Sequence, residues 1–308
     1  MNRYLITGSK GLLGSAFERA FVKNKFKYLA LNHEDCDLLD YSSLYRFVES
    51  FKPNILINCA ALVGGIKAND ERSFDFYYTN SIIQTNIMKL CKDLNVKNLV
   101  LLNSNCSYPI NSQQPYKESN FLDGQPHNSN LGYATAKRSG YLGGLMLQKQ
   151  YGIKTYHPIP CSLYGPNDNF NLENSHFIAA AIRKIFEAKK AKSSKLEFWG
   201  SGKPRREFMY VDDAVEGILF LLEKKLSGEL VNISWGIDHS IKDVIKIISE
   251  ELKFEGEIIW DKSKKDGAMS KLQDCTYLSK LGWRPKISLE EGLLKTINWF
   301  KNSKNIRK

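Results

Sequence analysis

A glycine-spaced turn close to the N-terminus constrains the fold of this chain more than any other feature. The segment YLITGSKGLLGSAF places Gly8, Gly11 and Gly14 after an apolar run and across the start of a helix. Glycines at this spacing let the backbone approach a pyrophosphate, and the helix N-terminus offers N–H groups to it. The loop therefore predicts dinucleotide binding, with Lys10 and Leu12 among the residues that border the cofactor.

Short apolar runs alternate with helix-like segments through the first half of the chain, a pattern typical of βαβ units. The predicted strands span residues 4–7, 28–31, 55–58, 99–103, 154–157 and 230–233. Helical spacing of apolar residues predicts helices over 81–94, 176–188 and the segment SLEEGLLKTINWF. We expect an α/β chain, with a doubly wound parallel Rossmann sheet and a smaller mixed α/β C-terminal substrate domain.

The expected boundary between two domains follows Pro160, where the pattern becomes irregular. Residues 1–160 form the expected cofactor domain, and about 205–235 return to it. Residues 161–204 and 236–308 form the expected substrate-binding domain. The segment YGPNDNFNLENS, just after the boundary, has the composition of a loop.

Composition and charge bear on the partners and the location. The net charge of +11 comes from lysines spread along helices and the tail, so we expect no nucleic-acid partner. No apolar run approaches the ~20 residues of a membrane span, so we expect no membrane partner, and MNRYLITG lacks signal-peptide architecture. The six cysteines lack CxxC or metal-ligand spacing, which favours free thiols, no metal and a cytoplasmic location.

The end of the second predicted strand bears on which dinucleotide is bound. A fold selective for NAD places a carboxylate there, but LNHED puts Asn32 and His33 before the acids. Lys10 and His33 could instead face a 2′-phosphate, so we favour NADPH over NADH. Farther along, Asp37 and Leu38 are candidates for contact with the adenine.

Two further strand ends border the expected cofactor path. Ala60 and Ala61 follow the third predicted strand, where small residues permit a close approach to the pyrophosphate. Pro160 follows the strand predicted at 154–157, where we expect the nicotinamide face.

A tyrosine and a lysine lie on one face of a predicted helix. Tyr133 and Lys137 are four residues apart in YATAK. A lysine ammonium near a phenol favours the phenolate and lowers the pKa of the tyrosine, which suits acid–base work. Ser104, after the strand at 99–103, can hydrogen-bond a substrate carbonyl while Tyr133 exchanges a proton with its oxygen. Beside a dinucleotide, these three residues predict hydride transfer to a carbonyl.

This combination resembles the extended short-chain dehydrogenase/reductase family. Within that family, VGGIKAND, NSNCSYP, FWGSGKPRREFMYVDD and LGWRPKISLEEGL are similar to segments of the GDP-L-fucose synthases, in this order over nearly the whole chain. The resemblance implies NADPH-dependent reduction at C4 of a GDP-linked 4-keto-6-deoxy sugar, after epimerisation at C3 and C5. It also implies a homodimer.

The resemblance assigns Ser104, Tyr133 and Lys137 to the reduction and a second pair, Cys106 and His176, to the epimerisation. A ketone at C4 acidifies the hydrogens on C3 and C5, so a thiolate can remove one and an imidazolium can return a proton to the opposite face. Structural alternatives stay open for both. Cys106 could pack beside a strand end, and His176 could bond the backbone at a helix N-terminus.

For the nucleotide end, the resemblance assigns Arg206 to the diphosphate, which suits the bidentate geometry of a guanidinium. The alternative for Trp199 is packing between domains. The remaining substrate-binding candidates, which the resemblance places around the guanosine diphosphate or the sugar, are Val63, Gly64, Ser162, Trp199, Asp266 and Lys271.

Four positions depart from the family pattern. Ser162 stands where the family has an asparagine near the sugar, and Ser270 where an arginine precedes the lysine. Asn105 replaces a serine, and Gly132 replaces the proline before Tyr133. The changed wall around the sugar leaves an alternative, a stand-alone C4 reductase that acts on a GDP-4-keto-6-deoxy-heptose for capsular polysaccharide after a separate epimerase.

Two alternatives are more distant. One is a 4-epimerase or 4,6-dehydratase that retains NAD. Dehydratases generally carry a threonine and an acidic residue around positions 104–106, where this chain has SNC. A non-catalytic NADPH-binding regulator would typically lack the Tyr133 and Lys137 pair, which is present here.

Overall fold

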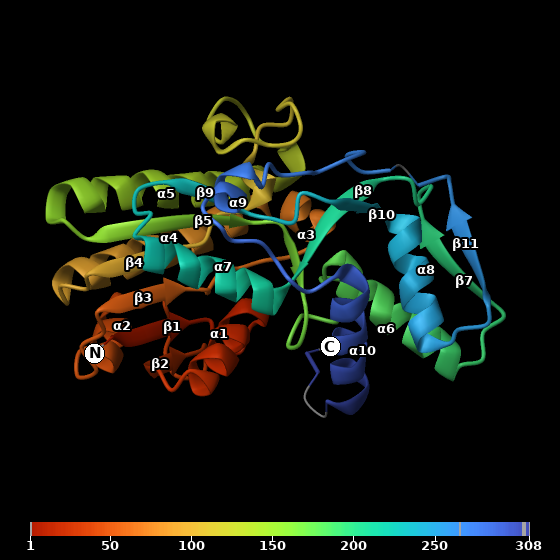
Figure 1. Ribbon diagram of the computed structural model, residues 1–308, viewed down its shortest axis with the longest axis horizontal. Coiled ribbons are helices and arrows are strands. Elements are labelled where there is room, and N and C mark those ends of the chain that lie inside the picture. The colour runs from red at the N-terminus through yellow and green to blue at the C-terminus, as the bar shows by residue number, and fades with distance from the viewer. Residues whose placement is uncertain (1, 265, 304–305, 308) are drawn as a thin grey trace.

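The computed structural model describes residues 2–264, 266–303 and 306–307. Its largest sheet has six strands, all parallel, in the order β2-β1-β3-β4-β5-β9 (Figure 1). The strands are β1 (Arg3–Thr7), β2 (Lys27–Leu31), β3 (Ile55–Asn58), β4 (Asn98–Leu101), β5 (Lys154–Pro160) and β9 (Leu230–Ile233). The order reverses at β1, so the carboxyl ends of β1 and β3 flank a crevice where such folds bind dinucleotides.

Helices cover both faces of this sheet, because alternate residues of each strand point to opposite sides. On one face Tyr4 and Ile6 share a buried cluster with side chains of α1 and α7. On the other face Leu5 and Leu56 share a cluster with α2, α4 and α5. The helices are α1 (Leu12–Lys23), α2 (Tyr41–Val48), α3 (Ile66–Glu71), α4 (Ser73–Asp93), α5 (Leu131–Tyr151) and α7 (Val211–Lys224).

The second part of the molecule contains two small sheets, with strand orders β10-β8-β6 and β11-β7. Its core includes Tyr164, Ile182, Phe208 and Leu293, and it lies beside the large sheet in Figure 1. Its elements are β6 (Ser162–Tyr164), β7 (Lys195–Trp199), β8 (Arg205–Tyr210), β10 (Asp238–Ser240), β11 (Glu257–Asp261), α6 (Phe177–Lys190), α8 (Ile241–Leu252) and α10 (Leu289–Asn302). The short helix α9 (Thr276–Lys280) packs instead on β9 of the large sheet. Three short 3₁₀ helices, η1 (Asn105–Ser107), η2 (Glu118–Asn120) and η3 (Asn128–Asn130), lie between β4 and α5.

The predicted fold class is confirmed, and the strands agree with the predictions except at some ends. β4 ends at Leu101, where its pairing with β3 ends, although the Asn103 N–H still donates to Pro158 O at 2.9 Å. β5 continues to Pro160, beyond the predicted end at 157, because β9 pairs with residues 157–160. The predicted helices lie in α4, α6 and α10.

The predicted division into two domains stays a prediction. Within the segment 205–235, α7 packs on α1 and β9 extends the large sheet, whereas β8 lies in the three-stranded sheet. All six cysteines lie in the described residues as free thiols. In the described part of the chain, the helices are too short or too polar to cross a membrane.

Candidate active site

The loop between β1 and α1 has no space for a side chain at Gly8 or Gly14. Gly8 has a φ of 65°, and a Cβ there would lie 2.8 Å from Ala60 N. A Cβ on Gly14 would lie 2.2 Å from the carbonyl oxygen of Gly8. The helix begins after Gly11, which has no side chain to cap it. The loop thus presents backbone N–H groups at the positive end of a helix, a cradle that fits a dinucleotide pyrophosphate.

The predicted small residues after β3 pack against this loop. Ala60 N–H donates to Thr7 Oγ1 at 3.4 Å, and Ala60 and Ala61 are half-buried. The Asn80 side chain of α4 bonds both the N–H and the carbonyl of Leu62, at 2.9 and 3.0 Å. These bonds hold residues 60–62 along the carboxyl edge of the sheet. Leu12, the first residue of α1, and Pro160, the last of β5, are both half-buried.

Lys10 of the glycine loop forms an ion pair with Glu34, just after β2. The pair joins the two segments between which the adenosine end of a dinucleotide is expected. The pKa of Glu34 is lowered, mainly by its hydrogen bond and charge interaction with Lys10 and to a smaller extent by His33. Asn32 donates to Asp35 Oδ2 at 2.6 Å and accepts from Glu34 N at 2.9 Å. Its side chain therefore shapes the turn.

The two candidates for the adenine differ in exposure. Asp37 is exposed and accepts from the N–H of Leu39 at 2.9 Å. Leu38 is buried, and its carbonyl accepts from Asn86 of α4 at 2.8 Å. Asp37 therefore fixes a local turn, and Leu38 anchors that turn in the core beneath it.

Tyr133 and Lys137 lie one turn apart on α5, with the lysine almost fully buried. Lys137 is 4% exposed, and its ammonium lies 5.5 Å from the centroid of the Tyr133 ring. Burial lowers the pKa of Lys137 to about 8. Burial raises the pKa of Tyr133, Cys106 raises it further, and the neighbouring Ser104 hydroxyl opposes this rise. The prediction that Lys137 lowers the pKa of Tyr133 is wrong for this structure, because burial outweighs every other influence.

Ser104 and Cys106 share a turn at the end of β4. Ser104 caps η1, and its Oγ accepts from the Cys106 N–H at 3.2 Å. The Cys106 thiol is half-buried, and its Sγ lies 3.9 Å from Lys271 Nζ. The structure therefore brings Ser104, Cys106 and Tyr133 together. It also places Lys271, which is 165 residues away in the sequence, beside Cys106.

His176 is the N-cap residue of α6, but its ring does not cap that helix within the described residues. Burial lowers its pKa. A Cβ on Gly65 would lie 3.6 Å from the carbonyl oxygen of Ser175, so the VGGI loop lies beside the segment that carries His176. In that loop Val63 is exposed, and Gly64 packs against Phe76. The epimerase candidate and the candidate sugar loop are thus neighbours.

Arg206 points toward the segment that carries Lys271. Its Nη1 donates to the carbonyl of Ala268 at 2.7 Å. Its pKa is lowered, first by burial, while the nearby Cys106 and Tyr116 oppose that shift. Ser162, at the start of β6, pairs with Phe208 of the same strand that carries Arg206. Ser162 and Arg206 therefore lie on neighbouring strands of the three-stranded sheet.

Trp199 is the last residue of β7, and Asp266 lies in the segment after β11, where it contacts the loop that follows β7. Trp199 is 71% exposed, which is more than packing between domains would allow. Asp266 accepts from the N–H of Ser201 at 2.8 Å and from its hydroxyl at 2.6 Å. Asp266 therefore shapes the 199–201 loop, and its contact with a nucleotide stays a prediction.

Residues 4–234 match the NAD dependent epimerase/dehydratase family. The chain belongs to this family. It is 38% identical to the putative GDP-L-fucose synthase 2 of Arabidopsis thaliana, over 97% of this chain and 91% of that protein. The resemblance to the GDP-L-fucose synthases that the motifs predicted is confirmed.

Two solved structures are similar to this member of the epimerase/dehydratase family. The GDP-L-fucose synthetase of Naegleria fowleri bound to NADP superposes with a TM-score of 0.91 at 29% identity, covering 100% of this chain and 95% of that one. A GDP-6-OMe-4-keto-L-xylo-heptose reductase from C. jejuni superposes with a TM-score of 0.89 at 28% identity, covering 97% of each chain. The likeness therefore extends over both parts of the molecule.

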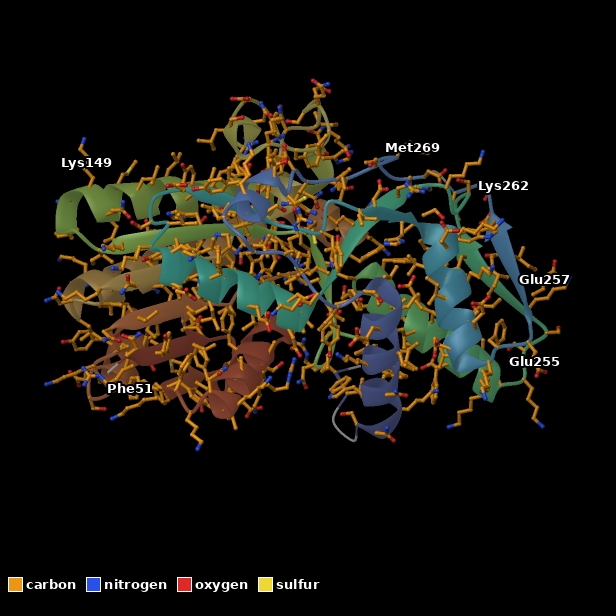
Figure 2. The ribbon with its side chains drawn as sticks, in the orientation of Figure 1. Phe51, Lys149, Glu255, Glu257, Lys262 and Met269 are labelled. Atoms are coloured by element: carbon orange, nitrogen blue, oxygen red, sulfur yellow. The ribbon has the colours of Figure 1, made fainter. Side chains whose placement is uncertain are left out.

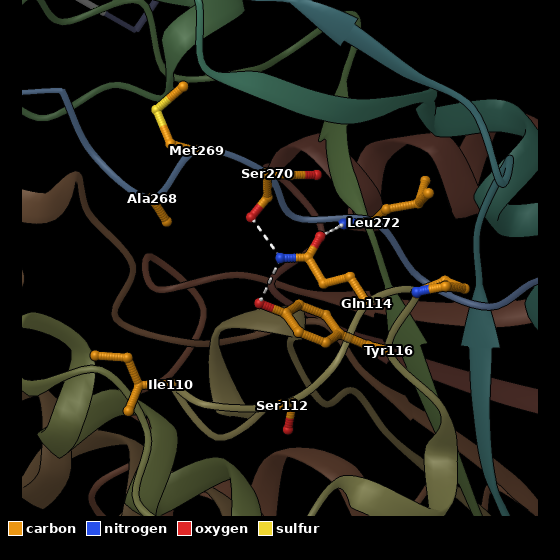
Figure 3. A pocket seen from close by; sticks show the side chains of 9 residues that line it. Ile110, Ser112, Gln114, Tyr116, Ala268, Met269, Ser270 and Leu272 are labelled. Carbon is orange, nitrogen blue, oxygen red and sulfur yellow. Dashed lines mark hydrogen bonds between the residues drawn. The ribbon is translucent and has the colours of Figure 1, made fainter.

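Sequence reasoning missed the role of the segment 110–116. It lies against residues 268–272 across a hollow of about 560 Å³, and Met269 stands at its outer rim (Figures 2 and 3). Gln114 bonds the backbone on both sides of Lys271. No motif in the sequence predicts this contact, because Gln114 is 156 residues from Ser270 and 158 residues from Leu272.

Proposed function

We propose that this protein is an NADPH-dependent C4-keto reductase of a GDP-linked 4-keto-6-deoxy sugar, and that it epimerises C3 and C5 before the reduction. The observation that carries this proposal is the turn at the end of β4. The Cys106 N–H bonds Ser104 Oγ at 3.2 Å, and Tyr133 lies beside both residues. A candidate carbon base and a candidate oxygen acid therefore face the same small region, as adjacent carbons of one sugar require.

The cofactor binds, in this proposal, along the carboxyl edge of β1 and β3. The cradle at Gly8, Gly11 and Gly14 and the small residues Ala60 and Ala61 support this placement. When bound, NADPH supplies the hydride for C4. Lys10 and His33 are the candidates for the 2′-phosphate, and the remaining candidates along the path are Leu12, Asn32, Asp37, Leu38 and Pro160.

Epimerisation comes first because it needs the C4 ketone. The Cys106 thiolate removes a proton from C3 or C5, and the electron pair moves to the C4 oxygen as an enolate. His176 in its protonated form gives a proton to the opposite face of the same carbon, which restores the ketone. The lowered pKa of the buried His176 makes this form a stronger acid. Once C4 is reduced, these hydrogens lose their acidity, so the order of the two steps is fixed.

Reduction then uses the side chains of α5 and η1. The Tyr133 phenol, kept neutral by burial, donates its proton to the C4 oxygen as the alcohol forms. The Ser104 hydroxyl hydrogen-bonds the same oxygen and orients it. The buried Lys137 ammonium stabilises the phenolate that Tyr133 becomes once its proton has left.

The nucleotide end lies on the second part of the molecule. Arg206 is the proposed contact for the diphosphate. Its guanidinium is partly buried and lies near Cys106, which supports this placement. The other proposed contacts, which border the sugar or the guanosine, are Val63, Gly64, Ser162, Trp199, Asp266 and Lys271.

The decisive experiment mixes the protein with NADPH and GDP-4-keto-6-deoxy-mannose and follows cofactor absorbance. We expect oxidation of NADPH and, in D₂O, deuterium at C3 and C5 of the product. Failure to consume NADPH with any 4-keto sugar nucleotide would reject the reductase. Consumption without deuterium at either carbon would leave the reductase and remove the epimerase.

A GDP-4-keto-6-deoxy-heptose is the second candidate substrate, for a stand-alone reductase that follows a separate epimerase. It is supported by the likeness to the C. jejuni heptose reductase and by the short Ser162 side chain on the sugar side. A panel of hexose and heptose 4-keto nucleotides separates the two: a kcat/KM at least about tenfold higher for the heptose would favour this candidate.

We propose a homodimer built on α4 and α5, whose surfaces carry the exposed apolar side chains Phe74, Tyr77, Tyr78, Leu142 and Met146. The division into a cofactor domain and a sugar-nucleotide domain, a cytoplasmic location and a role in capsular polysaccharide belong to the same proposal.

A further inference from the structure

Gln114 clamps the backbone on both sides of Lys271. Its Nε2 donates to the carbonyl of Ser270 at 2.8 Å, and its Oε1 accepts from the N–H of Leu272 at 2.9 Å (Figure 3). The main chains add a short pairing, in which Tyr116 N–H donates to Leu272 O at 2.8 Å. Gln114 therefore fixes both peptide groups that flank Lys271, and the bond from Tyr116 fixes the next peptide group along the chain.

Lys271 uses this fixed backbone to place its ammonium beside a thiol. Its Nζ lies 3.9 Å from Cys106 Sγ, across 165 residues of sequence. The side chain of its neighbour Ser270 turns elsewhere, with its hydroxyl 3.2 Å from Asp238 Oδ2. A cation next to a cysteine favours the thiolate, which is the nucleophilic and basic form.

We propose that Gln114 is a positioning residue for Lys271, and that Lys271 in turn places its ammonium against the Cys106 sulfur that takes the proton in epimerisation. The proposal rests on the function proposed above. Lys271 keeps all its protons during the step. The proton from the sugar carbon goes to Cys106 Sγ, the electron pair goes to the C4 oxygen, and the stabilising charge stays in place.

The structure also explains why a glutamine suits this position. Ser270 offers a carbonyl and Leu272 an N–H, so the clamp needs one donor and one acceptor on the same side chain. Glutamate retains the acceptor for Leu272 but loses the donor for Ser270, and methionine loses both at similar length. The series Gln, Glu, Met therefore removes the clamp in steps.

The test measures alkylation of Cys106 by iodoacetamide in the intact protein without substrate, with the modified peptide identified by mass spectrometry. Near pH 7 we expect Gln114→Met and Lys271→Met each to slow alkylation about tenfold, and Gln114→Glu to slow it less. Lys271→Arg keeps the charge and should stay close to the wild type. The double variant Gln114→Met/Lys271→Met should be no slower than Lys271→Met alone, because both act on one contact.

Gln125→Met is the matched control, since Gln125 lies in the same connection and donates to Asn128 Oδ1 at 3.1 Å, away from Lys271. It should leave the alkylation rate unchanged. Normal alkylation in Gln114→Met beside slow alkylation in Lys271→Met would overturn the positioning role. Normal rates in both would overturn the role of Lys271.

The alkylation assay is independent of turnover, so the two proposals fail separately. If the variants behave as expected but no 4-keto sugar is reduced, the clamp is supported and the proposed function is rejected. If turnover is found, deuterium incorporation at C3 and C5 in Gln114→Met should fall about tenfold in kcat with little change in KM. Equal incorporation in Gln114→Met and wild type would overturn the catalytic relevance of the clamp.

Discussion

The N–H of Gly132 donates to Ser73 Oγ at 3.1 Å, and a Cβ on Gly132 would lie 1.9 Å from the carbonyl oxygen of Ser73. This contact joins the first turn of α5 to the first turn of α4, one residue before Tyr133. Gly132 is thus a backbone contact point, and its departure from the family pattern has a structural reason in this chain.

Substitution of Gly132 should displace Tyr133. We expect Gly132→Ala to lower the free energy of unfolding by about 2 kcal/mol, because the clash with backbone outweighs the gain in helix propensity. The rate of NADPH oxidation should also fall, because the shifted backbone displaces Tyr133. Ser139→Ala, at an exposed position of α5, is the control and should change neither by much. Urea unfolding and initial rates measure the two effects, and an unchanged Gly132→Ala protein would contradict this account.

Cys106→Ser should separate epimerisation from reduction. Loss of the thiolate should reduce deuterium incorporation at C3 and C5 by at least about 100-fold, because a serine hydroxyl is a far weaker base. Hydride transfer to an already epimerised 4-keto sugar should stay within about tenfold of wild type. Cys275→Ser, another half-buried thiol, is the control. Deuterium incorporation that survives in Cys106→Ser would remove the thiol from the reaction.

The ion pair between Lys10 and Glu34 should tune the choice of cofactor. Both side chains are exposed, so the effect is modest and sensitive to salt. Glu34→Gln frees Lys10 for a 2′-phosphate and should strengthen NADPH binding about threefold, whereas Lys10→Met should weaken it by a similar factor. NADH affinity should change little. Fluorescence titration measures both cofactors, with the exposed Lys27→Met as control; equal effects on NADPH and NADH would refute this assignment.

Lys137 should destabilise the ligand-free protein at neutral pH. Its pKa is lowered to about 8 by burial, against about 10.4 in an unfolded chain. Between these values the unfolded state binds more protons, so the free energy of unfolding rises with pH in this window. Lys137→Met should therefore be more stable than wild type by about 1–3 kcal/mol near pH 7, although inactive. This advantage should shrink as pH rises from about 8 toward 10.

Urea unfolding across that pH range checks the prediction. Lys149→Met on the same helix is the control, because Lys149 is exposed and projects from the surface (Figure 2). An advantage of Lys137→Met that stays constant with pH would show that packing, not the buried charge, causes it.

The apolar surface of α4 and α5 should set the oligomeric state. Met146 is 65% exposed on α5, and Tyr78 is 51% exposed on α4. We expect a dimer in light scattering with size-exclusion chromatography, and a shift toward monomer in Met146→Lys and Tyr78→Lys. Val22→Lys, at a 65% exposed apolar position on α1, should remain dimeric. A wild-type monomer at micromolar concentration would contradict the proposed interface.

Local patterns predicted the parts of the site that lie close together in the chain. The glycine loop and the pair of Tyr133 and Lys137 depend on spacing within one turn of backbone, which the sequence displays directly. The strand end at Asn58 follows from an apolar run, whereas pairing with β9 extends β5 from the predicted end at residue 157 to Pro160. Sequence reasoning was wrong on the pKa of Tyr133, because that pKa depends on burial by distant segments.

The sequence by itself determined the parallel sheet, the dinucleotide loop and the residues able to move a proton or orient a carbonyl. Only the tertiary structure decided that Lys271 faces Cys106, that Gln114 holds it there, and that Asp266 is engaged with Ser201. The physical reason is the separation along the chain of the residues that interact. Helix and strand periodicity are local, whereas the charge around a thiol depends on which remote segments the folded core brings within a few ångströms of it.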